Sequence, residues 1–135
     1  MALGAALGAL AVAMPAQGST EELTSSWAKI NICDSSQMGA RAQLAGDGST
    51  DQMQVRFIAQ WLSPDGWVPL AGQATSPWQD AGSAEFTWAQ AGWTFNLAVP
   101  EAEAGTSYQL RAIAEMDLGS GRSSTQTTGA CTLGG

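Results

Sequence analysis

The sequence lacks histidine altogether and is poor in basic residues. Lys and Arg together number 5 of the 135 residues, Asp and Glu number 12, and the formal net charge is −7. Without histidine the chain cannot assemble a Ser-His-Asp or Cys-His catalytic set, and it lacks the commonest zinc ligand. The scarcity of Lys and Arg argues against nucleic acid as a partner, because phosphate contacts need a clustered basic surface.

Charged residues of both signs are also scarce, at 13% of the chain, whereas the hydrophobic fraction of 44% is ordinary. Disorder requires low hydrophobicity together with high net charge, so this composition predicts a folded protein. A length of 135 residues suits one domain with a single core.

The first residues read as a targeting segment. Residues 2–13 (ALGAALGALAVA) are uncharged, with Ala11 and Ala13 in an A-x-A pattern, and the run is too short to cross a bilayer. No Lys or Arg precedes it, as in a signal peptide truncated at its N-terminus; the alternative is a short Ala-rich helix packed on the domain. We predict a secreted protein that meets the membrane only through its export signal. Its predicted parts are a signal peptide at 1–16, a polar lead-in at 17–26 and a β-sandwich domain at 27–133.

Two cysteines, Cys33 and Cys131, lie far apart and form no C-x-x-C motif. An even number of cysteines in an exported protein predicts one disulfide between them. Closing so long a loop stabilises the folded state by about 4–5 kcal/mol in the chain-entropy account. The alternative is a pair of buried free thiols.

From residue 27 onward the hydrophobic pattern has a period of two, typical of strands. Residues 53–61 alternate apolar and polar side chains, residues 63–66 (SPDG) predict a turn, and residues 67–70 predict a short edge strand. A second hairpin is expected at 84–99, with Ala91 and Gly92 as its turn. That register places Phe86, Trp88, Trp93, Phe95 and Leu97 on one face.

The third strong strand pattern covers residues 106–116 and leads through a turn at 117–121 into a final strand at 122–131. Weaker strands are expected at 27–32 and 39–45. Seven or eight short strands with regular turn signals and no helical window predict an antiparallel β-sandwich.

The stretch GTSYQLRAIA at 105–114 resembles the penultimate strand of fibronectin type III and related immunoglobulin-like domains. Residues 27–131 are also similar to uncharacterised secreted β-sandwich domains of high-GC Gram-positive bacteria. The similar pieces are NICD at 31–34, MGAR at 38–41, VRF at 55–57, SPW at 76–78, GWTF at 92–95 and LR at 110–111. The resemblance implies an immunoglobulin/fibronectin type III-like fold and no particular ligand. It further implies that the first and last strands lie side by side and parallel, which would bring Cys33 and Cys131 together.

No catalytic set is evident, so we predict a protein that is not an enzyme. Glu85, Glu115 and Asp117 are the formal candidates for a paired-carboxylate glycosidase, which needs a cleft holding two carboxylates. Residues 46–51 (GDGSTD) offer oxygen ligands for calcium, but this composition is also typical of a hairpin loop, which we favour. We predict no metal site and no cofactor.

Six tryptophans are unusual for so small a domain. Trp61 and Trp88 fall in phase with core residues and are expected to be buried. Trp67 and Trp78 lie in or beside loops, where an exposed indole can stack on a sugar ring or anchor a protein. For Trp78 we favour a plug at the end of the core, with ligand binding as the alternative.

Three of the four arginines, Arg41, Arg56 and Arg111, fall at outward strand positions and are expected to form a charged ladder with acidic residues on one face. The sequence as a whole predicts a non-catalytic extracellular module with an unknown protein or polysaccharide partner, acting in binding or as a spacer. The alternative is a carbohydrate-binding module that uses Trp67 and Trp78.

Overall fold

The computed structural model describes residues 25–70, 74–97 and 107–134. Within these residues the protein is all-β and contains no helix. The predicted signal peptide and nearly all of the predicted lead-in lie outside the described residues. The strands are β1 (Trp27–Cys33), β2 (Gln37–Ala45), β3 (Gln52–Ser63), β4 (Gly66–Pro69), β5 (Gln79–Ser83), β6 (Trp88–Asn96), β7 (Ser107–Gly119), β8 (Arg122–Thr127) and β9 (Cys131–Gly134).

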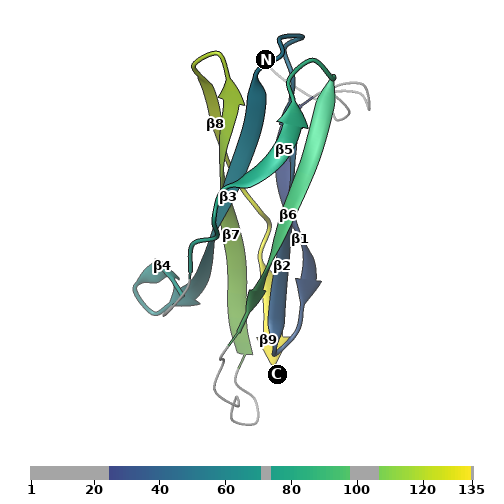
Figure 1. Ribbon diagram of the computed structural model, residues 1–135. Coiled ribbons are helices and arrows are strands. Elements are labelled where there is room, and N and C mark those ends of the chain that lie inside the picture. The colour runs from purple at the N-terminus through teal and green to yellow at the C-terminus, as the bar shows by residue number, and fades with distance from the viewer. Residues whose placement is uncertain (1–24, 71–73, 98–106, 135) are drawn as a thin grey trace, which may run out of the picture.

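The strands form two antiparallel sheets, one of three strands in the order β1-β2-β6 and one of six strands built around the pair β3 and β7. In the larger sheet, β4 and β5 both pair with the free side of β3, and β8 and β9 both pair with the free side of β7. Figure 1 shows the two sheets as two layers of an elongated molecule. This arrangement is consistent with the β-sandwich expected from the sequence.

The core lies between the layers because alternate side chains of each strand point inward. On β3 the predicted alternation over residues 53–61 is confirmed, with Met53, Val55, Phe57 and Ala59 fully buried and Trp61 packed against the core. On β7 the alternation predicted for residues 106–116 is also confirmed in the described residues. The buried apolar residues of β7 are Leu110, Ala112, Ala114, Met116 and Leu118.

Both edges of the larger sheet are interrupted, and a buried hydroxyl lies at each break. Between β4 and β5, Phe57 donates its backbone N–H to Ser76 Oγ over 2.8 Å. Between β8 and β9, Ala112 donates its N–H to Thr128 Oγ1 over 2.9 Å. Each hydroxyl therefore accepts a backbone hydrogen bond at the point where the edge strand is broken.

The predicted hairpin at 84–99 is wrong. Residues 88–96 form one continuous strand, β6, which passes through Ala91 and Gly92 and pairs with β2 over nine residues. Because β6 has no turn, its side chains alternate between the two faces along the whole strand. Trp93 and Phe95 therefore point inward, whereas Trp88 points outward. Trp88 is 44% exposed, and the prediction that it is buried is therefore also wrong.

The final predicted strand at 122–131 is divided into β8 and β9, and the predicted turn at 117–121 is shorter than expected. Leu118 is buried as part of β7, and the turn consists of Ser120 and Gly121. Ser120 has a positive φ of 55° and lies between two glycines that also have positive φ. This left-handed conformation makes a tight connection that leaves both flanking strands long.

The structure joins Cys33 to Cys131, with 6.5 Å between their Cα atoms. The expectation that the first and last strands pair side by side is wrong, because β1 pairs with β2 in the smaller sheet and β9 pairs with β7 in the larger one. The disulfide therefore connects the two layers rather than two neighbouring strands of one sheet.

Candidate functional site

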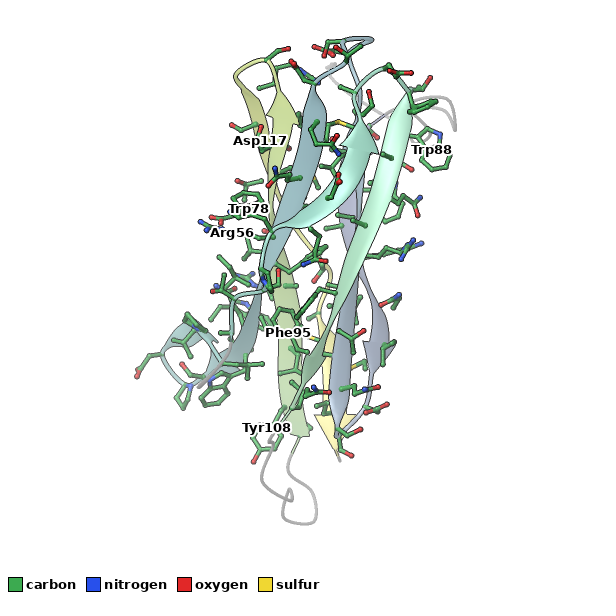
Figure 2. The ribbon with its side chains drawn as sticks, viewed as in Figure 1. Arg56, Trp78, Trp88, Phe95, Tyr108 and Asp117 are labelled. Carbon is green, nitrogen blue, oxygen red and sulfur yellow. A yellow bond between two sulfur atoms is a disulfide. The ribbon has the colours of Figure 1, made fainter. Side chains whose placement is uncertain are left out.

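Trp67 and Trp78, the two tryptophans singled out in the sequence, lie on the same outer face of the larger sheet. Trp67 is on β4 opposite Leu62, one of the outward residues of β3. Trp78 precedes β5, one residue before the Gln79–Val55 pair, and points outward beside Arg56, as Figure 2 shows. Trp78 is 44% exposed, so the expectation that it plugs the end of the core is wrong.

Each of these tryptophans is stacked against an arginine of the central strand pair. The guanidinium carbon of Arg56 on β3 lies 4.8 Å from the ring centroid of Trp78. The guanidinium carbon of Arg111 on β7 lies 4.4 Å from the ring centroid of Trp67. Both distances are within the range of cation–π contacts, worth about 0.5–1 kcal/mol each at exposed positions.

The two arginines have different polar partners. Arg56 forms an ion pair with Glu115, its cross-strand neighbour on β7, with 2.5 Å between Nε and Oε1. Arg111 donates from Nε to Oε1 of Gln60 over 2.8 Å, and among the described residues it forms no ion pair. The Arg56 site is therefore locally neutral, whereas the Arg111 site retains a positive charge.

Apolar side chains separate the two stacked pairs. Ile58 on β3 and Ile113 on β7 lie directly opposite each other and are only partly buried. Sequence reasoning left both out of the site, although isoleucine at an outward position of an alternating strand was the available signal. We call the outward surface formed by these residues the tryptophan–arginine face. Its members are Arg56, Ile58, Gln60, Trp67, Trp78, Arg111, Ile113 and Glu115.

The spacing of the face follows from strand geometry. Arg56 and Gln60 are four residues apart on β3, and Arg111 lies directly opposite Gln60. At about 3.3 Å per residue, the two arginines are separated by roughly 13 Å along the strands. The face can thus present two aromatic rings and two guanidinium groups to one extended ligand, with an apolar strip between them.

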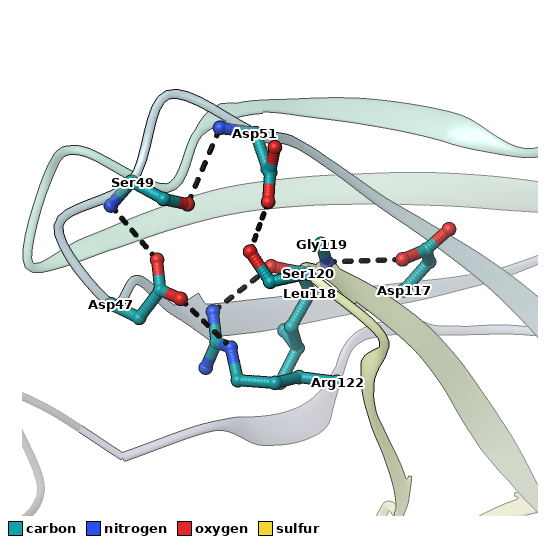
Figure 3. Close-up of polar contacts among 8 residues, drawn as sticks. All are labelled: Asp47, Ser49, Asp51, Asp117, Leu118, Gly119, Ser120 and Arg122. Atoms are coloured by element: carbon teal, nitrogen blue, oxygen red, sulfur yellow. Dashed lines mark hydrogen bonds and ion pairs between the residues drawn. The ribbon is translucent and has the colours of Figure 1, made fainter.

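Figure 3 shows the hydrogen bonds and the ion pair formed by acidic residues of the loop considered for calcium, residues 46–51. Asp47 accepts the N–H of Ser49 over 2.9 Å, and its other oxygen lies 3.3 Å from Nε of Arg122. Hydrogen bonds from Ser49 lower the pKa of Asp47, and Arg122 adds to this effect. Nearby, Ser120 donates its hydroxyl to Asp51. In the described part of the chain no group of three or more acidic, Cys or His residues could hold a metal ion.

The three carboxylates considered for catalysis are dispersed. Glu115 is paired with Arg56, Asp117 accepts the N–H of Gly119 at the end of β7, and Glu85 is exposed in the turn before β6. A cleft of about 770 Å³ lies between β6 and residues 69–70 and 74–77. Among the described residues its lining contains no Asp or Glu. The lining residues are Pro69, Leu70, Ala74, Thr75, Ser76, Pro77, Trp93, Thr94, Phe95 and Asn96.

The arginine ladder expected from the sequence is divided between two faces. Arg56 and Arg111 belong to the tryptophan–arginine face, whereas Arg41 lies on β2 in the other sheet. No helix that could span a membrane occurs within residues 25–70, 74–97 and 107–134. No family model matches the sequence, and no curated protein matches it.

Proposed function

We propose that the protein is a secreted, non-catalytic binding module that holds its ligand on the tryptophan–arginine face. One observation carries this proposal. Trp67 and Trp78 come from separate segments of the chain, yet both lie on one sheet face, each against an arginine of the central strands. Indole rings on a flat surface are well suited to binding, because they offer a large rigid contact area at low entropic cost.

The finer classification is part of the same proposal. Two antiparallel sheets joined by a Cys33–Cys131 disulfide support an immunoglobulin/fibronectin type III-like sandwich, as does the resemblance of residues 105–114. A disulfide also supports an extracellular location, since such bonds persist in oxidising compartments.

A carbohydrate ligand is the second candidate, and the geometry of the face favours it. The stacked pairs are separated by roughly 13 Å along the strands, and both rings lie on one open surface. Sugar rings can stack on successive indoles while their hydroxyl groups accept hydrogen bonds from Arg111 or Gln60.

The test is a binding assay with the oxidised full chain on insoluble polysaccharides and cell-wall preparations, with tryptophan fluorescence recorded in parallel. Trp78→Ala is the test variant, and Phe86→Ala is its control, since Phe86 is 60% exposed in the turn before β6 and lies outside the tryptophan–arginine face. We expect Trp78→Ala to weaken binding by about tenfold or more, and Phe86→Ala to leave it unchanged.

If no polysaccharide is retained, the same variants are compared by cross-linking to proteins of the secreted fraction. A cross-linked partner that is lost in Trp67→Ala and Trp78→Ala supports a protein ligand on this face. A neutral polysaccharide or a protein that is bound equally by the wild type and by both variants would contradict the assignment of the site.

A further inference from the structure

The smaller sheet places two cations directly opposite each other. Lys29 on β1 pairs with Arg41 on β2, and both side chains are exposed. These are two of only 5 basic residues in a chain of net charge −7. The three strands of this sheet contain no Asp or Glu. Like charges opposite each other destabilise a sheet, so the pair is not explained by stability.

Both cations contact residues of one neighbouring cross-strand row. The Lys29 ammonium lies 4.8 Å from the ring centroid of Trp27, and Arg41 donates from Nε to Oε1 of Gln90 over 3.2 Å. Trp27 and Gln90 occupy that row on β1 and β6, on either side of Gln43 on β2. The two positive charges therefore flank a central amide.

A glycine allows the arginine to take this position. Gly92 lies opposite Arg41, and a Cβ atom built there would be 3.3 Å from Nη1 of Arg41. The absence of a side chain at 92 lets the guanidinium lie across β6. In the central row, Gln90 donates from Nε2 to Oε1 of Gln43 over 3.2 Å. Trp88 lies beyond this row and is 44% exposed.

We propose that this surface, the basic–aromatic patch, binds acidic polysaccharide. Its exposed or half-buried members are Trp27, Lys29, Arg41, Trp88 and Gln90, and the buried amide of Gln43 supports Gln90 through their hydrogen bond. Guanidinium and ammonium groups pair with sugar carboxylates, indoles stack on sugar rings, and amide groups bind hydroxyls. An anionic chain is repelled by most of this acidic molecule and is attracted where acidic residues are missing.

Topology favours a glycan over an acidic peptide. A peptide that binds a sheet through its main chain adds to an exposed edge. The patch is centred instead on β2, the middle strand, whose backbone is paired on both sides. The described acidic residues on this sheet's connections all accept hydrogen bonds from serines; they are Asp34, Asp47, Asp51 and Glu85.

This site goes beyond the proposed function, because it lies on the other sheet and uses other residues. Its probe is polygalacturonate, compared with the fully methyl-esterified polymer, which has the same backbone but no charge. Binding is measured by affinity electrophoresis and tryptophan fluorescence at low and high salt. The test variant is Lys29→Gln/Arg41→Gln, and Arg122→Gln on β8 is the control that removes a charge outside both surfaces.

We expect retention by polygalacturonate that added salt weakens, about tenfold weaker binding in the double variant, and unchanged binding in Arg122→Gln. Thermal unfolding of each variant checks that the fold is intact. The proposal is overturned if the double variant binds like the wild type, if the esterified polymer binds equally well, or if polyglutamate binds more tightly than polygalacturonate. None of these results depends on Trp67 or Trp78, so this site and the proposed function can fail separately.

Discussion

Gly46 is the described glycine whose backbone surroundings leave the least room for a side chain. It follows β2 and donates its N–H to the carbonyl oxygen of Thr87, over 3.0 Å. A Cβ atom at this position would lie 2.5 Å from the carbonyl oxygen of Ala84 and closer still to that of Phe86. Both obstacles are backbone atoms, which cannot move aside as a flexible side chain can.

We therefore expect Gly46→Ala to lower the free energy of unfolding by about 1–3 kcal/mol, through displacement of the turn before β6. Gly129→Ala is the control, because nothing lies within 4 Å of a Cβ atom there. That variant should stay within about 0.5 kcal/mol of the wild type. Urea unfolding followed by tryptophan fluorescence measures both, and equal stability of the two variants would count against this account.

At the scale of the element, the larger sheet completes both of its edges in the same way. Each edge consists of two short strands, and one buried hydroxyl occupies the interval between them, Ser76 beside β3 and Thr128 beside β7. The main-chain N–H groups of both residues also donate, to the carbonyl oxygens of Phe57 and Ala112. The two hydroxyl-bearing residues thus continue the hydrogen-bond ladder where the strands themselves are broken.

Thr128→Val keeps the shape of the side chain but removes the acceptor for the N–H of Ala112. We expect it to destabilise the protein by about 1–3 kcal/mol, the cost of leaving a buried donor without a partner. Thr127→Val makes the same chemical change at an exposed neighbour and should have little effect. Chemical denaturation compares the two variants, with hydrogen exchange at Ala112 as a local readout. Equal stability and unchanged exchange would refute the role given to Thr128.

For the whole molecule, the disulfide is a covalent cross-link between the two layers. Cys33 and Cys131 are 98 residues apart in sequence, one at the end of β1 and one at the start of β9. A bond that closes a loop of this length restricts the unfolded chain strongly, and the chain-entropy account gives about 4–5 kcal/mol.

Reduction, or the double variant Cys33→Ser/Cys131→Ser, should lower the free energy of unfolding by about 2–5 kcal/mol. Thermal unfolding with and without reductant measures the change. The serine variant is the control for the reductant, since its transition should not respond to it. A reduced wild type as stable as the oxidised protein would exclude this contribution from the disulfide.

Several elements could be predicted because their signal is local. The alternation of residues 53–61 and 106–116 identifies β3 and β7, and the residues SPDG at 63–66 identify the turn into β4. In each of these cases the side chains that define the element are neighbours in sequence, so periodicity and turn chemistry are sufficient to locate it.

β6 shows why the rest could not be predicted. Ala91 and Gly92 permit a turn, but pairing with β2 along the whole strand adds a full set of ladder hydrogen bonds and places Trp93 and Phe95 in the core. Local sequence contains no information on that partner. A turn at this point would place Trp88 and Trp93 on one face, whereas the continuous strand places them on opposite faces. The exposure of Trp88, and with it the basic–aromatic patch, depends on this long-range choice.

The all-β class and the positions of the two central strands follow from the amino-acid sequence alone, because alternating hydrophobicity is a property of neighbouring residues. The three-dimensional fold was needed to show that Trp67 and Trp78 share one face, that Lys29 and Arg41 share another, and that the disulfide joins the two layers. The physical reason is that strand pairing and layer assignment are set by contacts between distant segments. The free energy of such contacts depends on both segments together, so it cannot be read from either segment alone.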